Sequence, residues 1–152
     1  MGVIENHLSN VQRNLNALAI EKIIFDFLKS IQSHLAKTNA ERLNNKSQDV
    51  FGDPIGFYSR ATEIITLGQK KAGEPYDMKD TGEFLSKFYA SVSKGIITFG
   101  STDPKTDDIL DNPNLLSADL FGLTDGELKD VINQRLLPYF LKQVENTLTQ
   151  NN

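Results

Sequence analysis

The stretch Tyr89-Ala-Ser-Val-Ser-Lys-Gly-Ile-Ile-Thr-Phe-Gly-Ser101 decides the fold class of this chain. Its two halves, 89–93 and 96–101, are rich in β-branched and aromatic residues, which favour strands. Lys94-Gly95 lies between them, and glycine at such a position is typical of a tight turn. We therefore expect an antiparallel β-hairpin in the middle of the chain. Lys-Gly is a weaker turn signal than Asn-Gly, so it leaves the register of the two strands open.

The sequence before the hairpin has a helical pattern. Neither glycine nor proline occurs between Val3 and Phe51. The pattern is compatible with one long helix, or with two helices that break near Ser30 or Thr38. The polar stretch 37–49 predicts a fraying helix end and the start of a loop. The apolar residues recur at the spacings of an amphipathic helix: Leu15, Leu18, Ile23, Phe27, Ile31 and Leu35.

The sequence after the hairpin ends in a second helical pattern. Thr124-Asp-Gly-Glu127 has the spacing of a capping box, in which the first and fourth side chains bond each other's backbone N–H groups. An apolar stripe then runs from Leu128 to Leu148. Pro138 lies inside the stripe and should kink or restart the helix, because proline lacks a backbone N–H. The tail 150–152 is expected to be disordered.

The connecting segments carry turn and cap signals. Two glycines and a proline between Phe51 and Ser59 predict a loop. A short extended or helical piece should follow at 61–67, and an exposed loop at 69–75. Asp80 or Thr81 can cap a short helix that carries Phe84, Leu85 and Phe88.

The fold class that follows from these parts is α+β. It comprises an N-terminal helix or helix pair, a small antiparallel sheet with a central hairpin, and an amphipathic C-terminal helix. The 152 residues suit a single domain, 1–152. The segment 102–120, with two prolines, is expected to be a long connecting loop, and loops of this length are often functional.

The composition excludes several classes of protein. The chain contains no cysteine, which rules out disulfides, thiolate metal sites and a cysteine nucleophile. A net charge of −4 argues against a nucleic-acid partner. The N-terminus lacks the pattern of a signal peptide. No apolar run approaches the roughly 18 residues that span a bilayer, so no membrane association is expected.

The sequence offers no visible active site. His7 and His34 are far apart and lack a metal-binding spacing. The acidic set Asp103, Asp107, Asp108 and Asp111 lacks the alternation of a calcium loop, and a solvated turn explains it more simply. Nucleophile-elbow and phosphate-loop motifs are absent from the sequence. We therefore predict a protein that is not an enzyme and that needs no cofactor or metal.

Three segments in order carry a resemblance. They are Gly52-Asp-Pro-Ile-Gly56 with the following Phe-Tyr-Ser59, Met78-Lys-Asp80-Thr-Gly82-Glu-Phe84 with the hairpin to Ser101, and Leu120-Phe-Gly-Leu-Thr-Asp-Gly-Glu127. Together they resemble the virion-morphogenesis or tail-completion family of Mu-like phages and prophages, with its "D-P-x-G-x-x-W", "L-x-D-T-G-x-L" and "F-L-G-L-S" elements. The segment after the second strand lacks the family's histidine, which indicates a distant branch.

The resemblance implies a structural protein of a tailed phage or prophage that acts in tail completion or head–tail joining by forming a ring, that is, a closed homo-oligomer. Its partners would be copies of itself and other tail or neck proteins. Its location would be the cytoplasm of the bacterial host during assembly, and then the virion. The residues that match the family motifs, with structural roles expected for them, are Asp53, Pro54, Gly56, Asp80, Thr81, Gly82, Phe84, Gly100, Phe121, Gly122, Leu123 and Thr124.

The segment 102–120 is the expected place of assembly contacts, and deletion of its tip should leave a folded protein that fails to assemble. An alternative is an interaction module unrelated to phage, which binds a partner helix through its amphipathic helices. A further alternative is a metal-dependent hydrolase or nuclease that uses the acidic loop. The candidate contact residues are Asp103, Pro104, Asp107, Asp108, Ile109 and Leu110.

Overall fold

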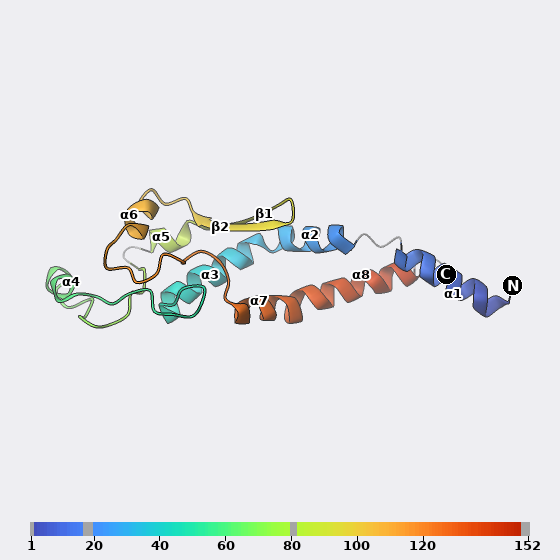
Figure 1. The fold of residues 1–152 in the computed structure, drawn as a ribbon, viewed down its shortest axis with the longest axis horizontal. Coiled ribbons are helices and arrows are strands. Elements are labelled where there is room, and N and C mark those ends of the chain that lie inside the picture. Colours follow the sequence, from blue (N-terminus) through green and yellow to red (C-terminus); the bar gives the residue numbers. More distant parts are fainter. Residues whose placement is uncertain (1, 17–19, 80–81, 150–152) are drawn as a thin grey trace. The chain divides into compact units, whose positions relative to one another are not determined.

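A computed structural model describes residues 2–16, 20–79 and 82–149. Its contacts divide the chain into two compact units, Met1–Ser30 with Lys129–Asn152, and Ile31–Leu128. The predicted α+β class is confirmed, since the described residues form helices and a two-stranded antiparallel sheet (Figure 1). The prediction of a single domain stays a prediction, and each unit is described by itself. The Leu18 position, the cap by Asp80 or Thr81 and the tail 150–152 lie outside the described residues.

The first unit consists of helices. Its members are α1 (Val3–Asn16), α2 (Ile20–Ser30), a π-helical turn η1 (Ile132–Leu136) and α8 (Leu137–Thr149). α8 contacts both α1 and α2. The rings of Phe27 and Tyr139 lie 5.1 Å apart, and Phe27 and Val131 are buried. These aromatic and aliphatic contacts form the small core of this unit.

The predicted break in the N-terminal helical pattern occurs near Ser30. The Ser30 hydroxyl donates to the Phe27 carbonyl, Ile31 follows, and α3 (Gln32–Lys46) begins. The alternative break near Thr38 is wrong, because α3 runs through that residue without interruption. For the stretch 37–49, the predicted start of a loop is confirmed, because α3 ends at Lys46, but the fraying helix end is wrong. Polar residues of this stretch are buried and hydrogen-bonded, which holds the helix to Lys46.

The helical ladder is interrupted at Pro138, as predicted. α7 (Asp125–Val131) leads into the π turn η1, in which the Leu137 N–H donates to the Ile132 carbonyl five residues back. Pro138 is the second residue of α8. A proline has no N–H to give to the preceding turn, and the π-helical form, which is rare, occurs mostly as a single turn inside an α-helix, as it does here.

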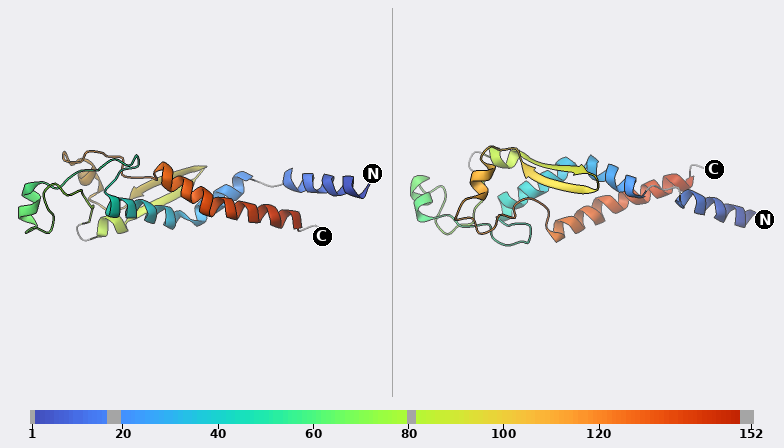
Figure 2. Two further views of the ribbon diagram at one scale, coloured as in Figure 1. Left: turned by 90° about the horizontal axis from the view of Figure 1, so that it is seen from below. Right: turned by 45° about the horizontal axis from the view of Figure 1, so that its top comes forward.

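The second unit is built around α3 and the hairpin. β1 (Phe88–Ser93) pairs with β2 (Ile96–Ser101) in antiparallel register, with Ala90 opposite Phe99. Lys94 and Gly95 both have positive φ, 50° and 76°, which is the type I′ turn whose twist suits a two-residue hairpin loop. The predicted hairpin is therefore confirmed, and the structure supplies its register. α3 lies along β1 in both views of Figure 2.

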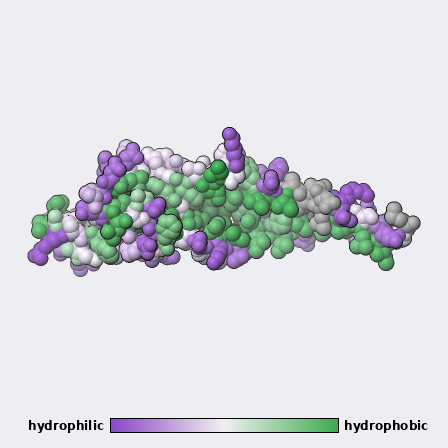
Figure 3. All heavy atoms as spheres, in the orientation of Figure 1, coloured by the Kyte–Doolittle hydropathy of each residue, from purple (hydrophilic) through white to green (hydrophobic). Residues whose placement is uncertain are grey.

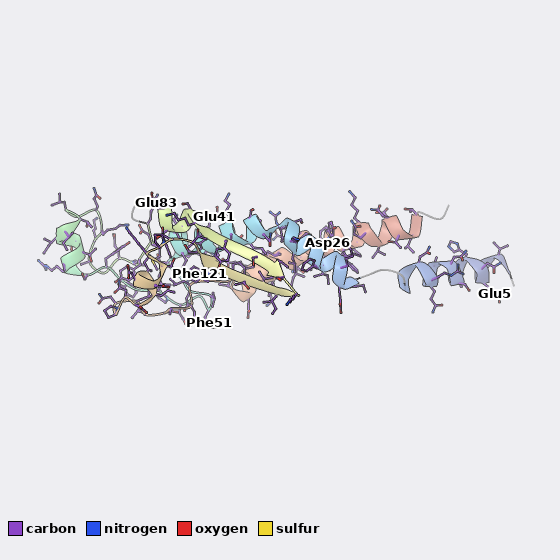
Figure 4. The ribbon with its side chains drawn as sticks, turned by 90° about the horizontal axis from the view of Figure 1, so that it is seen from above. Glu5, Asp26, Glu41, Phe51, Glu83 and Phe121 are labelled. Atoms are coloured by element: carbon purple, nitrogen blue, oxygen red, sulfur yellow. The ribbon has the colours of Figure 1, made fainter. Side chains whose placement is uncertain are left out.

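The core of the second unit draws on distant parts of the chain. Leu43 of α3, Ile55 and Leu120 are fully buried and pack together. Phe84 of α5 (Glu83–Ser86) meets the ring of Phe88 edge-on at 5.0 Å. Phe121 lies 5.2 Å from Phe88, and Figure 4 shows it among the side chains of this unit. Other partly buried residues around this core are Tyr76, Met78, Leu85, Ile109, Leu110 and Leu115.

A buried polar clasp joins α3 to the segment 120–127; we use this name for Asn39 and Arg42 with their partners there. The Asn39 amide donates to the Leu120 carbonyl at 2.7 Å and accepts from the Gly122 N–H at 3.1 Å. Asn39 and Arg42 are both buried. Because buried polar groups need partners, these bonds fix the path of the chain before α7.

Arg42 uses its whole guanidinium group in the clasp. It donates to the carbonyls of Gln48, Leu120 and Gly122 at 2.9–3.1 Å, and to the Glu127 carboxylate at 2.7 Å. Only 1% of the Arg42 side chain is exposed. A planar fork of five N–H donors suits several acceptors at once, which a lysine could not satisfy.

The predicted capping box at the start of α7 is confirmed. The Glu127 N–H donates to the Thr124 hydroxyl at 3.2 Å, and the Thr124 N–H donates to the Glu127 carboxylate at 2.8 Å. The same carboxylate oxygen accepts from Arg42. The cap is therefore connected to α3, and it ties the start of α7 to the core.

Candidate functional site

The most exposed apolar group in the second unit lies at α4 (Arg60–Ile65). Ile64 is 68% exposed, Ile65 80% and Leu67 92%. We call these three residues the apolar tip. Apolar atoms gather at α4 in the space-filling view, on the left of the molecule (Figure 3). Full burial of such a side chain contributes about 1.5–3 kcal/mol, so this surface has a large free energy to gain from a partner.

The backbone beneath the apolar tip is held at both ends. Ser59 caps α4, since its hydroxyl accepts from the Thr62 N–H at 3.1 Å. At the other end, the Gly68 N–H donates to the Glu63 carbonyl at 2.8 Å, and the Lys70 N–H donates to the Thr66 hydroxyl at 3.1 Å. These bonds satisfy groups that a helix end leaves unpaired.

A polar cluster of Tyr58, Lys70 and Asp77 fixes the base of this loop. The Lys70 ammonium donates to both carboxylate oxygens of Asp77 at 2.7 Å and to the Lys79 carbonyl at 2.6 Å. The Tyr58 hydroxyl donates to Asp77 at 2.7 Å. The ammonium also lies 5.1 Å from the centroid of the Tyr58 ring, within the range of a cation–π contact.

The three groups of this cluster shift one another's pKa values. Burial raises the pKa of the Asp77 carboxyl, but hydrogen bonds from Lys70 and Tyr58 outweigh it, so that the pKa is lowered. Burial lowers the pKa of Lys70, and its bonds to Asp77 and Tyr58 raise it further than burial lowers it. Burial and the bond to Asp77 raise the pKa of Tyr58. The cluster is thus a brace that favours an anionic carboxylate and a cationic amine, which suits a structural role.

Acidification should weaken this brace. A carboxyl with a lowered folded-state pKa contributes stability above its unfolded pKa of about 3.9 and loses it as pH falls through the folded value. Asp77→Asn should therefore make the free energy of unfolding less dependent on pH between about 5 and 3. The Asp77 side chain is 36% exposed, so solvent screening keeps the effect within about 1 kcal/mol.

Urea unfolding at a series of pH values measures this effect. Tyr58→Phe is the matched variant, because it removes one hydrogen bond and leaves the Lys70 pair, and it should give an intermediate slope. Asp49 and Asp103, whose pKa values are also lowered, stay intact in both variants and contribute to the remaining slope. If the free energy of unfolding of Asp77→Asn changed with pH as steeply as that of the unchanged protein, Asp77 would not be the source of this pH dependence.

A pocket of about 430 Å³ lies beside the cluster. Its lining comes from the α4 loop, from α5 and from the 102–120 segment, and combines apolar and polar groups. The size lies in the range of ligand sites, but it is equally suited to a partner's side chain. Its lining includes Thr62, Tyr76, Met78, Phe84, Ile109 and Leu115.

The residues that match the family motifs mostly support the core. Gly56 is buried at φ 153°, and a Cβ there would lie 2.3 Å from the Tyr76 ring. Gly100 faces Tyr89, whose hydroxyl would lie 2.7 Å from an added Cβ. Gly82 has φ 85° at the start of α5. Asp53 and Pro54 are exposed, and the turn before them is closed by the Asp49 carboxylate.

The segment 102–120 differs from the loop expected there. It contains a short helix, α6 (Thr106–Leu110), and ends in the fully buried Leu120. Ile109 and Leu110 pack on the core, so deletion of this segment would remove core residues as well as surface. The proposed deletion test is therefore unsuitable, and point substitutions are preferable.

The six candidate contact residues fall into two groups. The Asp103 side chain is buried, accepts from the Lys105 N–H at 2.8 Å and pairs with Lys87 at 3.2 Å. The Lys105 N–H, acting against burial and together with Lys87, lowers the pKa of Asp103. Pro104, Asp107 and Asp108 are exposed, whereas Ile109 and Leu110 are packed inward. The exposed three are the ones available to a partner.

In the described part of the chain, neither a metal-binding group nor a membrane-spanning helix is found. Within residues 2–16, 20–79 and 82–149, no three His, Asp or Glu side chains are grouped in a way that could hold a metal ion. No helix of that same part has the length and apolar character needed to cross a membrane.

Several residues of this site could not be expected from the pattern. The loop 69–75 was expected to be exposed and flexible, yet Lys70 is partly buried in the brace.

The chain was compared with protein-family models, with curated proteins and with solved structures. It matches none of them.

Proposed function

We propose that this chain is a non-enzymatic structural protein of a tailed bacteriophage or prophage. It acts in tail completion or head–tail joining as one member of an oligomer. Its partners are further copies of itself and other tail or neck proteins. It works in the cytoplasm of the bacterial host during assembly and afterwards in the virion.

The phage part of this proposal rests on the three motif segments, and their positions are consistent with it. Ile55 of the first, Phe84 of the second and Leu120 with Phe121 of the third belong to one core. A family that shares these segments would share this scaffold. Loops on such a scaffold can vary and carry the contacts to partners.

The structural-protein part is carried by Leu67. This residue is 92% exposed and has φ 53°, a left-handed conformation that is unfavourable for leucine by about 1–2 kcal/mol. An exposed turn with this backbone favours glycine, asparagine or aspartate. In the isolated chain, this leucine gains no burial that would offset its unfavourable backbone conformation. Burial of its side chain against a partner would supply that gain.

The change Leu67→Asn separates stability from assembly. Asparagine adopts the left-handed conformation more readily, so the free energy of unfolding should rise by up to about 1 kcal/mol. Association through the apolar tip should weaken at least about tenfold, because a buried leucine contributes about 1.5–3 kcal/mol. Urea unfolding measures the first effect, and recovery of assembled particles measures the second.

Lys71→Asn is the matched control for this change. Lys71 lies in the same loop and is exposed, so its replacement removes no apolar surface from the apolar tip. It should leave both stability and assembly unchanged. If Leu67→Asn assembled as well as Lys71→Asn, the apolar tip would not be a contact surface.

A genetic experiment tests the role itself. The gene for this protein should lie in a prophage, among portal, capsid and tail genes. Deletion of the gene from the prophage should yield heads and tails that are not joined, or tails that are not finished. Electron microscopy of induced lysates would show them. Complementation with the unchanged gene should restore complete particles. Complete, infective particles after deletion would overturn the proposal.

The alternative of an interaction module without a phage role is favoured by α1. Val3, Ile4 and Leu8 of this helix are 86%, 75% and 61% exposed, and Ile4 and Leu8 are four residues apart on one face. A partner helix could cover this face. Leu8→Asp should abolish partner binding under this alternative, while the genetic experiment would find no phage genes beside this one.

A further inference from the structure

β2 has an open edge. In a hairpin with a two-residue turn, Ser93 and Ile96 form two backbone hydrogen bonds with each other. Such hydrogen-bonded pairs alternate along the strands with pairs that are not bonded, so every second residue of β2 directs its N–H and C=O away from β1. These residues are Ile97, Phe99 and Ser101. The matching edge of β1 agrees with this alternation, because the Val92 N–H donates to the Gln32 side chain instead of β2. Across the described residues, no partner is found for the outward N–H groups of β2.

The open edge lacks the usual protection. Natural edge strands carry charged residues, prolines or bulges that prevent pairing with another chain. β2 reads Ile-Ile-Thr-Phe-Gly-Ser, without a charge or a proline, and its pairing with β1 is continuous from residue 96 to residue 101. α3 packs along β1 and supplies the support that a two-stranded sheet needs, but its strong contacts are with β1 and not with β2.

We propose that β2 pairs with β2 of a second copy of this chain, in antiparallel orientation. The two hairpins then form one four-stranded sheet about a two-fold axis. The register that uses every outward group places Phe99 opposite Phe99 of the second copy, and Ile97 opposite Ser101. Each copy contributes the same three residues, as a self-complementary contact requires.

The side chains of β2 favour a second copy as the occupant. Residues opposite each other in a hairpin share a face, so Ile97 and Phe99 lie on the face of the buried Val92 and Ala90. They are only partly buried, because α3 lies along β1. Two Phe99 side chains brought opposite each other would cover this remaining surface, and aromatic cross-strand pairs stabilise sheets.

Charge agrees with the same register. β2 is uncharged, so two copies place no like charges opposite each other. Beyond the paired residues, the turn residue Lys94 of one copy comes beside the start of the 102–110 segment of the other. That segment exposes Asp107 and Asp108. Lys105 is exposed in the same segment, so the rim presents both signs of charge to Lys94, and it is the uncharged strand that supports this pairing.

This inference does not depend on the phage role, because it follows from the hairpin alone. Amide hydrogen exchange on the unchanged protein tests it, together with light scattering over a range of concentrations. The amides of Ile97, Phe99 and Ser101 should become protected at least about tenfold as the mass doubles, while those of Thr98 and Gly100 stay protected throughout.

Two outcomes of the exchange experiment would overturn the proposal. One is rapid exchange at residues 97, 99 and 101 when the protein is dimeric or when it is a monomer at every concentration. The other is protection of these amides in a monomer, which would mean that the chain covers its own edge. The deletion experiment on the phage role reads particle assembly, so the two proposals can fail separately.

Disulfide trapping gives the register, because the chain has no cysteine of its own. Phe99→Cys places two thiols opposite each other with Cα atoms about 5.5 Å apart, within disulfide range. Thr98→Cys is the control on the same strand. Its thiol lies on the other face, and its diagonal distance of about 7–8 Å to its counterpart is too long. Under mild oxidation, Phe99→Cys should become mostly covalent dimer and Thr98→Cys should not. Equal trapping of the two folded variants, or none with Phe99→Cys, would contradict the register.

Discussion

Replacement of Arg42 by alanine should lower the free energy of unfolding by about 3–5 kcal/mol, the cost of breaking a buried ion pair. The guanidinium donates to the carbonyls of Gln48, Leu120 and Gly122 and to the Glu127 carboxylate. Alanine leaves these acceptors without their donor in a place that water reaches poorly. A domain of this size has about 5–15 kcal/mol in total, so the variant should be close to unfolding at room temperature.

Urea unfolding followed by circular dichroism measures this loss. Lys37→Ala is the control, since it breaks the pair with Glu41 on the same helix, where the two side chains are 73% and 57% exposed. An exposed pair of this kind contributes about 0.3–0.5 kcal/mol. Arg42→Lys should restore only part of the stability. A lysine ammonium is a single point of charge and cannot donate to all the acceptors that the three guanidinium nitrogens reach. A loss below about 1 kcal/mol with Arg42→Ala would show that the clasp is not a major contributor.

Replacement of Gly56 by alanine should destabilise the protein by about 2–5 kcal/mol. Two effects add. Overpacking costs about 1–3 kcal/mol, and a backbone conformation that is unfavourable for L-residues costs a further 1–2 kcal/mol. The added methyl would lie 2.3 Å from the Tyr76 ring and 3.1 Å from the Asn114 carbonyl, at φ 153°. The ring cannot move freely, because it packs against Tyr58 at 4.9 Å.

Gly73→Ala separates these two effects. Gly73 also has positive φ, 84°, but its added Cβ meets nothing within 4 Å. This control should lose only the backbone part, about 1–2 kcal/mol. The difference between the two midpoints of thermal or urea unfolding then measures the close approach of Tyr76. Equal losses in the two variants would mean that the ring moves aside without cost.

The elements that the sequence predicted correctly are those with local signals. The hairpin is encoded by two strand-forming runs and a glycine turn, and the capping box by Thr124 and Glu127, all within a few residues of one another. The interruption at Pro138 follows from one missing N–H. Each depends on neighbours in the sequence, so no knowledge of the tertiary structure is needed.

The predictions failed mainly where contacts between residues far apart in the sequence determine the structure. Asn39 and Arg42 lie in a polar stretch that looks like a fraying helix end, and they become buried because carbonyls about 80 residues away need donors. Lys70 and Asp77 are only seven positions apart, but their bond depends on the fold of the loop between them, which has no periodic pattern. Such pairings depend on the path of the whole chain, which periodicity does not report.

The candidate site was only partly foreseen. The exposed carboxylates of Asp107 and Asp108 lie at the surface of the segment to which contacts were assigned, whereas Ile109, Leu110 and Asp103 proved to be largely inward. The apolar tip was missed. Its signal is the exposure of Leu67 together with its positive φ, and both are properties of the folded chain.

The clasp also has a consequence for the time course of folding. Arg42 and Glu127 are separated by 85 positions, so their bond requires the closure of nearly all of the second unit. The hairpin closes over two residues and needs no such loop. Because long loops close at an entropic cost before their contacts form, the hairpin should form early and the clasp late. Contacts that form after the rate-limiting step act mainly on the rate of unfolding, so the clasp sets how long the folded unit lasts once formed.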